Sequence, residues 1–329
     1  MREGFRRRLA DPGGEIALGA STHELLVRLL SALPFRRARR IVTTDGEFHT
    51  LRRQLARLEE EGFEVIRESA TDVDSLVERM TRHVGASTLA VFVSAVLFET
   101  ARIVPGLDRL AAACREGGVP LVVDVYHALG ALPFALAERG LEDAFVVGGG
   151  YKYLQLGEGN CFLRLPRGCE LRPVVTGWFA EFAELEATGD PRRVPYPAGA
   201  ARFAGSTYDP TSHYRAARVV EFFEQQGLDD ELLRAVSRHQ VGRLAAGFDA
   251  LDLPEGLVSR IRDVALDRFG AFLALRSPRA GDLKEALAAR GVAADARGTW
   301  LRLGPAPYLA DAQLDAAVAA LGEAARALA

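Results

Sequence analysis

Short apolar runs rich in β-branched residues alternate with segments of helical periodicity through the first two-thirds of the 329-residue sequence. The candidate strands are Arg40–Thr44, Phe63–Arg67, Leu89–Ser94, Pro120–Val125, Ala144–Gly148 and Asn160–Leu165. The candidate helices between them are Thr22–Leu33, Phe48–Glu61, Val73–His83 and Pro105–Glu116. Continuous Val, Leu and Phe runs are typical of strands buried on both faces. The alternation therefore predicts an α/β fold, with a mainly parallel sheet sandwiched by helices.

The pattern changes in the last third of the chain. Two long helical segments come first, from Thr211 to about Gln226 and from Asp230 to about Leu251. A strand follows, and after it come a helix at Asp282–Arg290, short strands at Val292–Ala296 and Thr299–Leu303, and a helix at Ala310–Ala327. We predict a large domain over residues 1–227 and a small α+β domain over residues 228–329.

Composition argues against several classes of protein. The 41 basic and 44 acidic residues are well mixed, so neither a nucleic-acid nor a membrane surface is indicated. No apolar run reaches the length of a membrane span, and the N-terminus lacks the apolar core of a signal peptide. The three cysteines, Cys114, Cys161 and Cys169, are odd in number and lack metal-ligand spacing. We expect a cytoplasmic protein with free thiols and no metal site.

Lysine is rare in this sequence. It has two lysines, Lys152 and Lys284, so the other 39 of its 41 basic residues are arginine. A primary amine that can lose its proton can form a carbon–nitrogen double bond with an aldehyde, whereas a guanidinium cannot. Lys284 lies on the polar side of an amphipathic helical segment and is expected to be a surface charge. Lys152 stands in Gly-Gly-Gly-Tyr-Lys-Tyr-Leu, between apolar strands, where a solvated charge is not expected.

Asp124 and His127 stand at the end of the strand predicted at Pro120–Val125. Ligands of parallel sheets bind beyond the carboxyl ends of the strands, although Asp124 could instead cap the next helix. Lys152 also follows a strand. A strand-end acid and a strand-end lysine suit a pyridine-based electron sink, because the carboxylate keeps the ring nitrogen protonated and the lysine holds an aldehyde carbon.

Three motifs, taken in order, resemble a known family. Asp-x-x-His at 124–127, Tyr-Lys-Tyr-Leu-x-x-Gly-x-Gly at 151–159 and Gly-Trp at 177–178 resemble kynureninase, within the class V aminotransferase superfamily of pyridoxal-phosphate (PLP) enzymes of fold type I. The resemblance implies a PLP transferase fold, pyridoxal 5'-phosphate as cofactor and a small-molecule amino-acid substrate. It also implies a homodimer with shared active sites.

The resemblance also implies roles for residues around the cofactor. Ser21 and Thr22, in the turn after Glu15-Ile-Ala-Leu-Gly, match a segment that contacts the phosphate, and a helix N-terminus supplies the N–H donors that a phosphate needs. Phe48 matches a ring that stacks on the pyridine, although a core position is the alternative. The remaining cofactor contacts are expected from Ser94, from the Tyr151 hydroxyl, and, across the dimer, from Trp178 and Thr207.

Substrate contacts are expected at two further places. Arg302 lies in a segment similar to the one whose arginine holds the substrate carboxylate, and a guanidinium fork binds a carboxylate through two hydrogen bonds. A surface charge is the alternative. Tyr208, or Asp209 under a one-residue shift, stands where the family has an asparagine that touches the aromatic part of the substrate. Kynureninases also have a longer N-terminal portion before the phosphate-binding turn; this sequence reaches that turn within about twenty residues, so we expect that portion to be absent.

We therefore interpret the chain as a PLP-dependent, kynureninase-like enzyme that cleaves the Cβ–Cγ bond of a kynurenine-type substrate hydrolytically. Lys152, Asp124 and His127 are its predicted catalytic residues. His127 would orient Asp124 or contact the ring oxygen, although a histidine at the start of a helix is the alternative. A class V aminotransferase or β-lyase would use the same lysine, acid and arginine, and an inactive scaffold is a further alternative. A cysteine desulfurase is disfavoured, because no cysteine follows Cys169.

Overall fold

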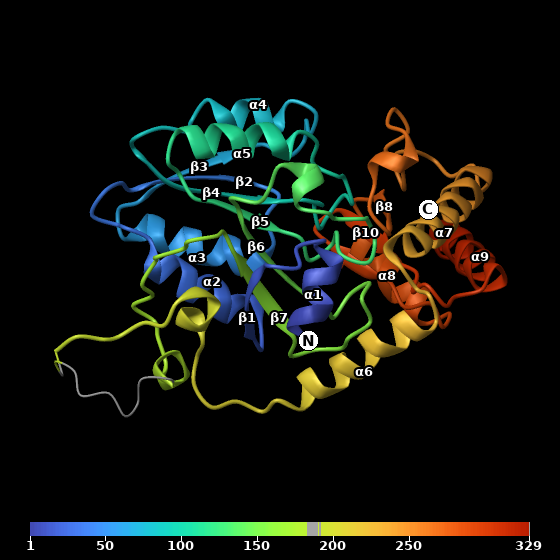
Figure 1. Cartoon of the computed structure of the whole chain (residues 1–329). Helices are drawn as coiled ribbons and strands as arrows, with labels where there is room; N and C mark the ends of the chain where they lie inside the picture. The colour runs from blue at the N-terminus through green and yellow to red at the C-terminus, as the bar shows by residue number, and fades with distance from the viewer. Residues whose placement is uncertain (183–189, 191, 329) are drawn as a thin grey trace. The chain divides into compact units, whose positions relative to one another are not determined.

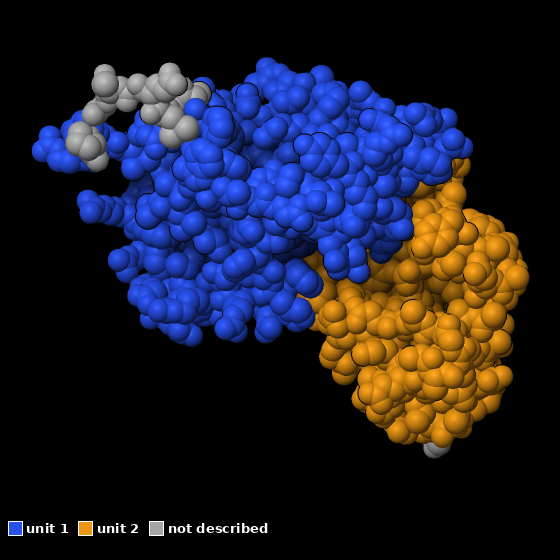
Figure 2. Space-filling view, turned by 90° about the horizontal axis from the view of Figure 1, so that it is seen from below, with its two compact units in different colours: residues 1–95, 104–129, 134–227 blue, residues 96–103, 130–133, 228–329 orange. Residues whose placement is uncertain are grey.

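The computed structural model describes residues 1–182, 190 and 192–328 (Figure 1). The chain forms two compact units, coloured separately in Figure 2. The first contains residues 1–95, 104–129 and 134–227, and the second contains residues 96–103, 130–133 and 228–329.

A seven-stranded sheet in the order β1-β7-β6-β5-β4-β2-β3 forms the centre of the first unit. Its strands are β1 (Glu15–Gly19), β2 (Arg40–Thr44), β3 (Glu64–Glu68), β4 (Thr88–Ser94), β5 (Leu121–Asp124), β6 (Phe145–Gly149) and β7 (Cys161–Leu165). β7 runs antiparallel to both of its neighbours, and the other pairs are parallel. The predicted mainly parallel sheet is confirmed, with β1 added at one edge.

Helices cover both faces of this sheet, with α2 and α3 on one side and α4 and α5 on the other (Figure 1). The helices of the first unit are α1 (Arg2–Arg8), α2 (Thr22–Ala32), α3 (His49–Glu60), α4 (Leu76–Thr81), α5 (Leu107–Glu116) and α6 (Thr211–Gln225). Short 3₁₀ helices lie at Ala137–Arg139, Trp178–Glu181 and Gly199–Phe203. Leu25 and Leu29 of α2 pack with Leu51 and Leu55 of α3 in the core beneath the sheet. Burying such a side chain contributes roughly 1.5–3 kcal/mol to the stability of the fold. The apolar residues whose spacing predicts these helices are therefore also the residues that attach them to the sheet.

The second unit has a three-stranded antiparallel sheet in the order β8-β10-β9, packed with helices. Its elements are α7 (Asp230–Ala250), a 3₁₀ helix (Leu266–Arg268), β8 (Leu273–Arg276), α8 (Ala280–Ala288), β9 (Asp295–Arg297), β10 (Trp300–Leu303) and α9 (Asp311–Leu328). The predicted small α+β arrangement is confirmed, but the start of the strand predicted at Val292 is wrong. The chain is still turning there, because Gly291 adopts a φ of 77° and the Val292 N–H bonds the Leu287 carbonyl.

The described residues bear on three further expectations. None of their helices is long and apolar enough to cross a membrane. Within the same residues, no group of three or more His, Cys, Asp and Glu side chains is arranged to hold a metal ion. Cys114, Cys161 and Cys169 are free thiols, and burial raises the pKa of Cys114 to about 12 and that of Cys161 to about 11.

Candidate active site

The carboxyl ends of β4, β5 and β6 bring three of the predicted residues to one edge of the sheet. Ser94, the last residue of β4, pairs in register with Asp124, the last residue of β5. Asp124 in turn pairs with Val147 of β6, and Lys152 lies in the loop that follows this strand. Lys152 is close enough to act on Asp124 electrostatically. A hydroxyl, a carboxyl and an amine therefore share this edge.

Glycine is required at two positions before the lysine, because the chain there passes close to other residues. A Cβ at Gly149 would lie 2.6 Å from the Cys161 Sγ and 2.7 Å from the Tyr126 ring. A Cβ at Gly150 would lie 2.4 Å from Asn160 Oδ1. Real Cβ atoms do not approach other atoms this closely, so a side chain at either position would force the loop away from β7.

The lysine loop is closed by its own hydrogen bonds. Leu156 N–H donates to the Gly150 carbonyl at 2.9 Å, and Gln155 N–H donates to the Lys152 carbonyl at 3.1 Å. The buried amide of Asn160 donates to the carbonyls of Leu156, Gly157 and Glu158. These bonds hold the backbone of Lys152 in one position.

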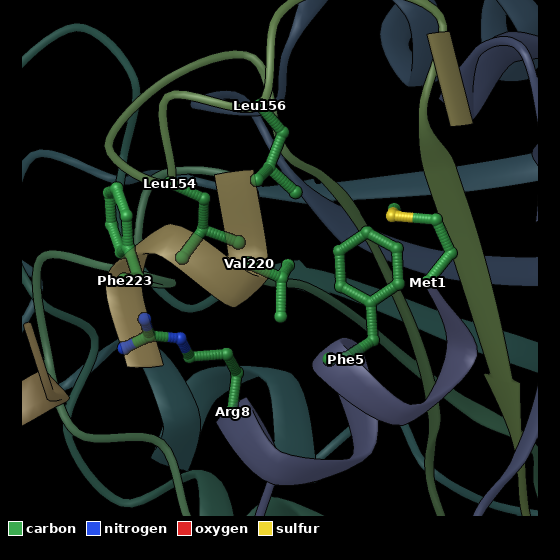
Figure 3. Close-up of a pocket in the computed structure, with 8 residues that line it drawn as sticks. Met1, Phe5, Arg8, Leu154, Leu156, Val220 and Phe223 are labelled. Carbon is green, nitrogen blue, oxygen red and sulfur yellow. The ribbon is translucent and has the colours of Figure 1, made fainter. Parts of the chain in front are cut away.

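Apolar side chains also pack around the lysine loop. Leu154 and Leu156 are buried and line a small cavity with Phe5 of α1 and Val220 of α6 (Figure 3). The cavity has a volume of about 10 Å³, at the lower limit for one water molecule, so it is a packing gap and has no room for a substrate.

Asp124 is held in a turn. Its Oδ1 accepts a hydrogen bond from the Tyr126 N–H at 2.8 Å, and the Ala128 N–H bonds the Val125 carbonyl at 2.9 Å. The residues after Asp124 form a turn and not a helix, so the alternative of a helix cap is wrong. The same turn holds the buried His127, which rules out a histidine at the start of a helix.

Electrostatically, Asp124 is a perturbed acid. Burial raises its pKa to about 6, while the Tyr126 hydrogen bond and the Lys152 charge act in the opposite direction. Because burial disfavours the ionised form of Asp124, any further cation that comes close to it stabilises the carboxylate.

The N-terminus of α2 lies at the same edge of the sheet. Gly19 at the end of β1 and Gly149 at the end of β6 both pair with Cys161 of β7. Ser21 caps the helix, and its side chain accepts the Glu24 N–H at 3.3 Å. The Thr22 N–H bonds the Cys161 sulfur. The start of an 11-residue helix, with its positive dipole end, is thus placed beside the lysine loop.

Phe48 and Tyr151 both present rings to the surface. Phe48 is the residue before α3 and is 37% exposed, so the alternative of a core position is wrong. Tyr151, directly before the lysine, is 53% exposed. Exposed rings beside a strand-end site are available to a ligand, and their proposed roles remain predictions.

Trp178, Thr207 and Tyr208 come together in an aromatic patch. The Trp178 indole N–H donates to Thr207 Oγ1 at 3.3 Å, and the Trp178 ring stacks on Phe182. The Tyr208 hydroxyl lies 3.1 Å from Nδ1 of His213. Trp178, Phe182 and Tyr208 are between 43% and 59% exposed. The patch belongs to the first unit, and its predicted role across a dimer remains a prediction.

Arg302 lies on β10 in the second unit. Its guanidinium lies 5.8 Å from the Phe98 ring and 5.5 Å from the Phe272 ring, and it donates to the Phe98 carbonyl and to the Asp295 carboxylate. The side chain is 11% exposed, so the alternative of a plain surface charge is wrong. The sequence did not point to Asp295, whose carboxylate also pairs with Arg297.

Sequence reasoning also missed Glu47. It lies between β2 and α3 with 2% of its surface exposed, and it bonds both the backbone and the hydroxyl of Ser94. A glutamate beside a glycine in a loop is usually solvated, so its neighbours in sequence carry no signal of burial.

Comparison with known proteins gives sequence relatives that include several kynureninases. No family model matches the chain. It is 29% identical over 209 residues to kynureninase from Xanthomonas axonopodis pv. citri (strain 306), an alignment that covers 61% of this chain and 48% of that protein. It is 29% identical over 141 residues to kynureninase from Xanthomonas campestris pv. campestris (strain B100), covering 42% and 32%. The chain therefore spans about half, or less, of the length of the curated relatives it matches.

Solved structures extend the likeness over nearly the whole chain. The apo structure of cysteine desulfurase from Thermococcus onnurineus NA1 has a TM-score of 0.80 at 16% identity, covering 99% of this chain and 83% of that one. The complex of the cystine C-S lyase C-DES with its product cysteine persulfide has a TM-score of 0.83 at 17% identity, covering 98% and 85%. A C-DES mutant with glycine linked covalently to its PLP cofactor has a TM-score of 0.82. The predicted resemblance to kynureninase is confirmed as sequence similarity, and the solved structures confirm the predicted fold, that of the type I PLP-dependent transferases.

Proposed function

We propose that this chain is a PLP-dependent enzyme that acts on an amino acid, with kynureninase-like hydrolytic cleavage of a Cβ–Cγ bond as its reaction. The observation that carries the proposal is the placement of Lys152 and Asp124 at the ends of neighbouring strands, where Lys152 acts on Asp124 electrostatically and burial raises the pKa of the acid to about 6. The sequence similarity to kynureninases supports the reaction class.

The residues at this edge fit each part of pyridoxal 5'-phosphate. Lys152 would hold the aldehyde carbon, and the Asp124 carboxylate would pair with the protonated ring nitrogen. The N-terminus of α2, with Ser21 and Thr22, would bind the phosphate, and the exposed Phe48 would cover the ring. When bound, the cofactor supplies an electron-accepting ring for the bonds at the substrate α-carbon.

The protein's own groups then position the substrate and move protons. Arg302 would bind the α-carboxylate, and the Lys152 amine, once released, would take up and return the α-proton. His127 would orient Asp124 or contact the ring oxygen, and Tyr208 would contact the aromatic part of the substrate. In the kynureninase reaction, water adds to the γ-carbonyl and the Cβ–Cγ bond breaks, which releases alanine and an anthranilate.

We further propose a cytoplasmic homodimer. The exposed patch around Trp178 and Thr207 is the surface expected to complete the partner's site, because exposed aromatic clusters mark protein interfaces. Residues 1–227 would form the cofactor-binding domain, and residues 228–329 would carry Arg302 as the small domain.

The two lysines of the chain allow a direct test. Protein mixed with pyridoxal 5'-phosphate is reduced with borohydride and digested, and the cofactor is located by mass spectrometry. The proposal predicts a visible absorbance band and cofactor on Lys152, both lost in Lys152→Ala and both kept in the matched control Lys284→Ala. Addition of L-kynurenine should then release anthranilate, followed by its fluorescence.

The other outcomes separate the alternatives. A band that does not respond to kynurenine would favour a class V aminotransferase or a β-lyase acting on another amino acid. Absence of the band in the wild-type protein would overturn the enzyme proposal and favour a scaffold.

A further inference from the structure

Glu47 is a buried carboxyl group held by neutral partners. Its Oε1 accepts hydrogen bonds from Thr44 Oγ1 at 2.8 Å and from the Ser94 N–H at 3.0 Å. Its Oε2 lies 2.6 Å from Ser94 Oγ. None of these hydrogen-bond partners, which are the ones found among the described residues, carries a charge, and Glu47 is 2% exposed. A charge in such a place is costly, so the neutral acid is favoured.

The charged group that faces Glu47 is another acid. Burial raises the pKa of Glu47 to about 7, and the negative charge of Asp124 at the end of β5 acts in the same direction. Lys152, beyond β6, acts on Asp124. The titratable neighbours of Glu47 on its own loop are engaged elsewhere, since Asp45 accepts the Ala70 N–H and His49 Nδ1 lies 3.2 Å from Arg52 Nη2.

The hydrogen bond between Glu47 and Ser94 can run in either direction. If Glu47 is ionised, the Ser94 hydroxyl must donate to Oε2, and Ser94 can then only accept on its other side. If Glu47 is neutral, its proton resides on Oε2, because Oε1 already accepts two donors. Oε2 then donates to Ser94 Oγ, and the Ser94 hydroxyl proton is released for another acceptor.

We propose that Glu47 is a positioning residue that holds one proton on Oε2 and thereby turns the Ser94 hydroxyl into a donor toward the cofactor site. Ser94 ends β4 directly beside Asp124, so its hydroxyl proton lies at the edge where the ligand is expected. The inference rests on the proposed function for the identity of that ligand. The proton held by Glu47 and the direction of its bond to Ser94 are properties of the cofactor-free protein.

The decisive variant is Glu47→Gln. The glutamine carbonyl can accept from Thr44 and from the Ser94 N–H while its amide donates to Ser94 Oγ, so it copies the neutral acid at every pH. Ser94→Ala removes the hydroxyl that the proton controls. Glu68→Gln is the control, because Glu68 is a partly buried acid of the same unit that forms an ion pair with Arg79 and lies 2.7 Å from His83 Nε2.

The first readout is the infrared spectrum of the cofactor-free full chain. We expect a protonated-carboxyl carbonyl band that disappears as pH rises through about 7. Glu47→Gln should remove the component that titrates near pH 7 and leave the component that Asp124 contributes near pH 6, Glu68→Gln should keep both, and Ser94→Ala should shift the frequency of the Glu47 component because the acceptor is lost. Absence from wild type of a component that Glu47→Gln removes, or a Glu47 component whose frequency Ser94→Ala leaves unchanged, would overturn the inference.

The second readout is the affinity for pyridoxal 5'-phosphate as a function of pH. One donated hydrogen bond corresponds to about threefold to tenfold in affinity. Wild type should lose this factor between pH 6 and pH 8.5, whereas Glu47→Gln should keep the tighter value and Ser94→Ala the weaker one. Matching pH profiles for Glu47→Gln and wild type would contradict the proposal. If wild type binds no pyridoxal 5'-phosphate, the proposed function fails, and the infrared result alone decides the state of Glu47.

Discussion

Replacing Asp124 by asparagine should change stability and cofactor binding in opposite directions. Asparagine keeps the shape and the Oδ1 acceptor for the Tyr126 N–H, so the turn is retained. It removes the charge that burial disfavours. A residue that serves only to hold the turn would show the gain in stability without the loss of affinity, so the change in affinity is the informative one.

The size of the stability effect follows from the pKa. The folded chain raises the pKa of Asp124 from 3.8 to about 6, so the folded state binds more protons than the unfolded state between these values. The stabilising contribution is therefore fully present below pH 3.8 and is lost as pH rises through about 6. At 1.36 kcal/mol per pH unit, and allowing for solvent at its partly exposed edge, the loss is about 1–3 kcal/mol.

Cofactor-free Asp124→Asn should thus be more stable than wild type at pH 7.5 by about 1–3 kcal/mol, with the difference vanishing near pH 4. Its affinity for pyridoxal 5'-phosphate should fall roughly 10- to 150-fold at pH 7.5, because a charge-assisted hydrogen bond to the ring nitrogen is lost. Urea denaturation and fluorescence titration measure the two quantities. Asp143→Asn, an exposed acid that pairs with Arg115, is the control and should change neither. A destabilised variant, or an affinity within twofold of wild type, would refute the reasoning.

Three further predictions concern the lysine loop and the substrate arginine. Gly150→Ala should cost about 1–3 kcal/mol and reduce the trapping of cofactor, because its Cβ meets Asn160, whereas Gly85→Ala, with open space around it, should cost little in the same denaturation assay. Arg302→Lys keeps the charge but loses the fork, so steady-state kinetics should show KM for the amino acid rising about tenfold or more with a smaller change in kcat. Asp295→Asn removes an internal carboxylate from Arg302 and should lower that KM, and an unchanged or higher KM would show that Asp295 does not compete with the substrate.

The positions of the strands in the large sheet were predictable because a local run of apolar residues marks each of them. The strand predicted at Arg40–Thr44 is β2 itself, and those predicted at Leu89–Ser94 and Asn160–Leu165 differ from β4 and β7 by one residue. Val, Phe and Leu runs bury on both faces whatever surrounds them. The strand predicted at Val292 failed for a local reason too, since a turn glycine one residue earlier delays the strand.

The common position of Asp124 and Lys152 could be predicted from sequence because topology brings strand ends together, whereas Ser94 was identified through the family resemblance. In a parallel sheet the carboxyl ends of β4, β5 and β6 reach one edge, so Ser94, Asp124 and Lys152 had to lie near one another once the strands were correct. The orientation of a ring such as Phe48 depends on packing, which the sequence does not state, and its exposure came only with the structure.

The acids that the sequence did not reveal share a physical cause. Glu47 is buried by a strand end 47 residues away in the chain, and Asp295 is held by arginines on its own small sheet. In each case the neighbour decides whether the carboxylate is a solvated charge or an internal one. Glu47 is buried among neutral hydrogen-bond donors and faces a second acid, so the free energy of its protonated form is lower than that of its ionised form below about pH 7. Asp295 lies beside the guanidinium groups of Arg302 and Arg297. Burial raises its pKa, but the two cations lower it further than burial raises it, so Asp295 stays ionised. Two acids that the sequence presents alike thus differ in the structure: the surroundings of Glu47 favour a bound proton, whereas Asp295 is an internal counterion of Arg302, which a substrate carboxylate would have to displace if Arg302 binds it as proposed.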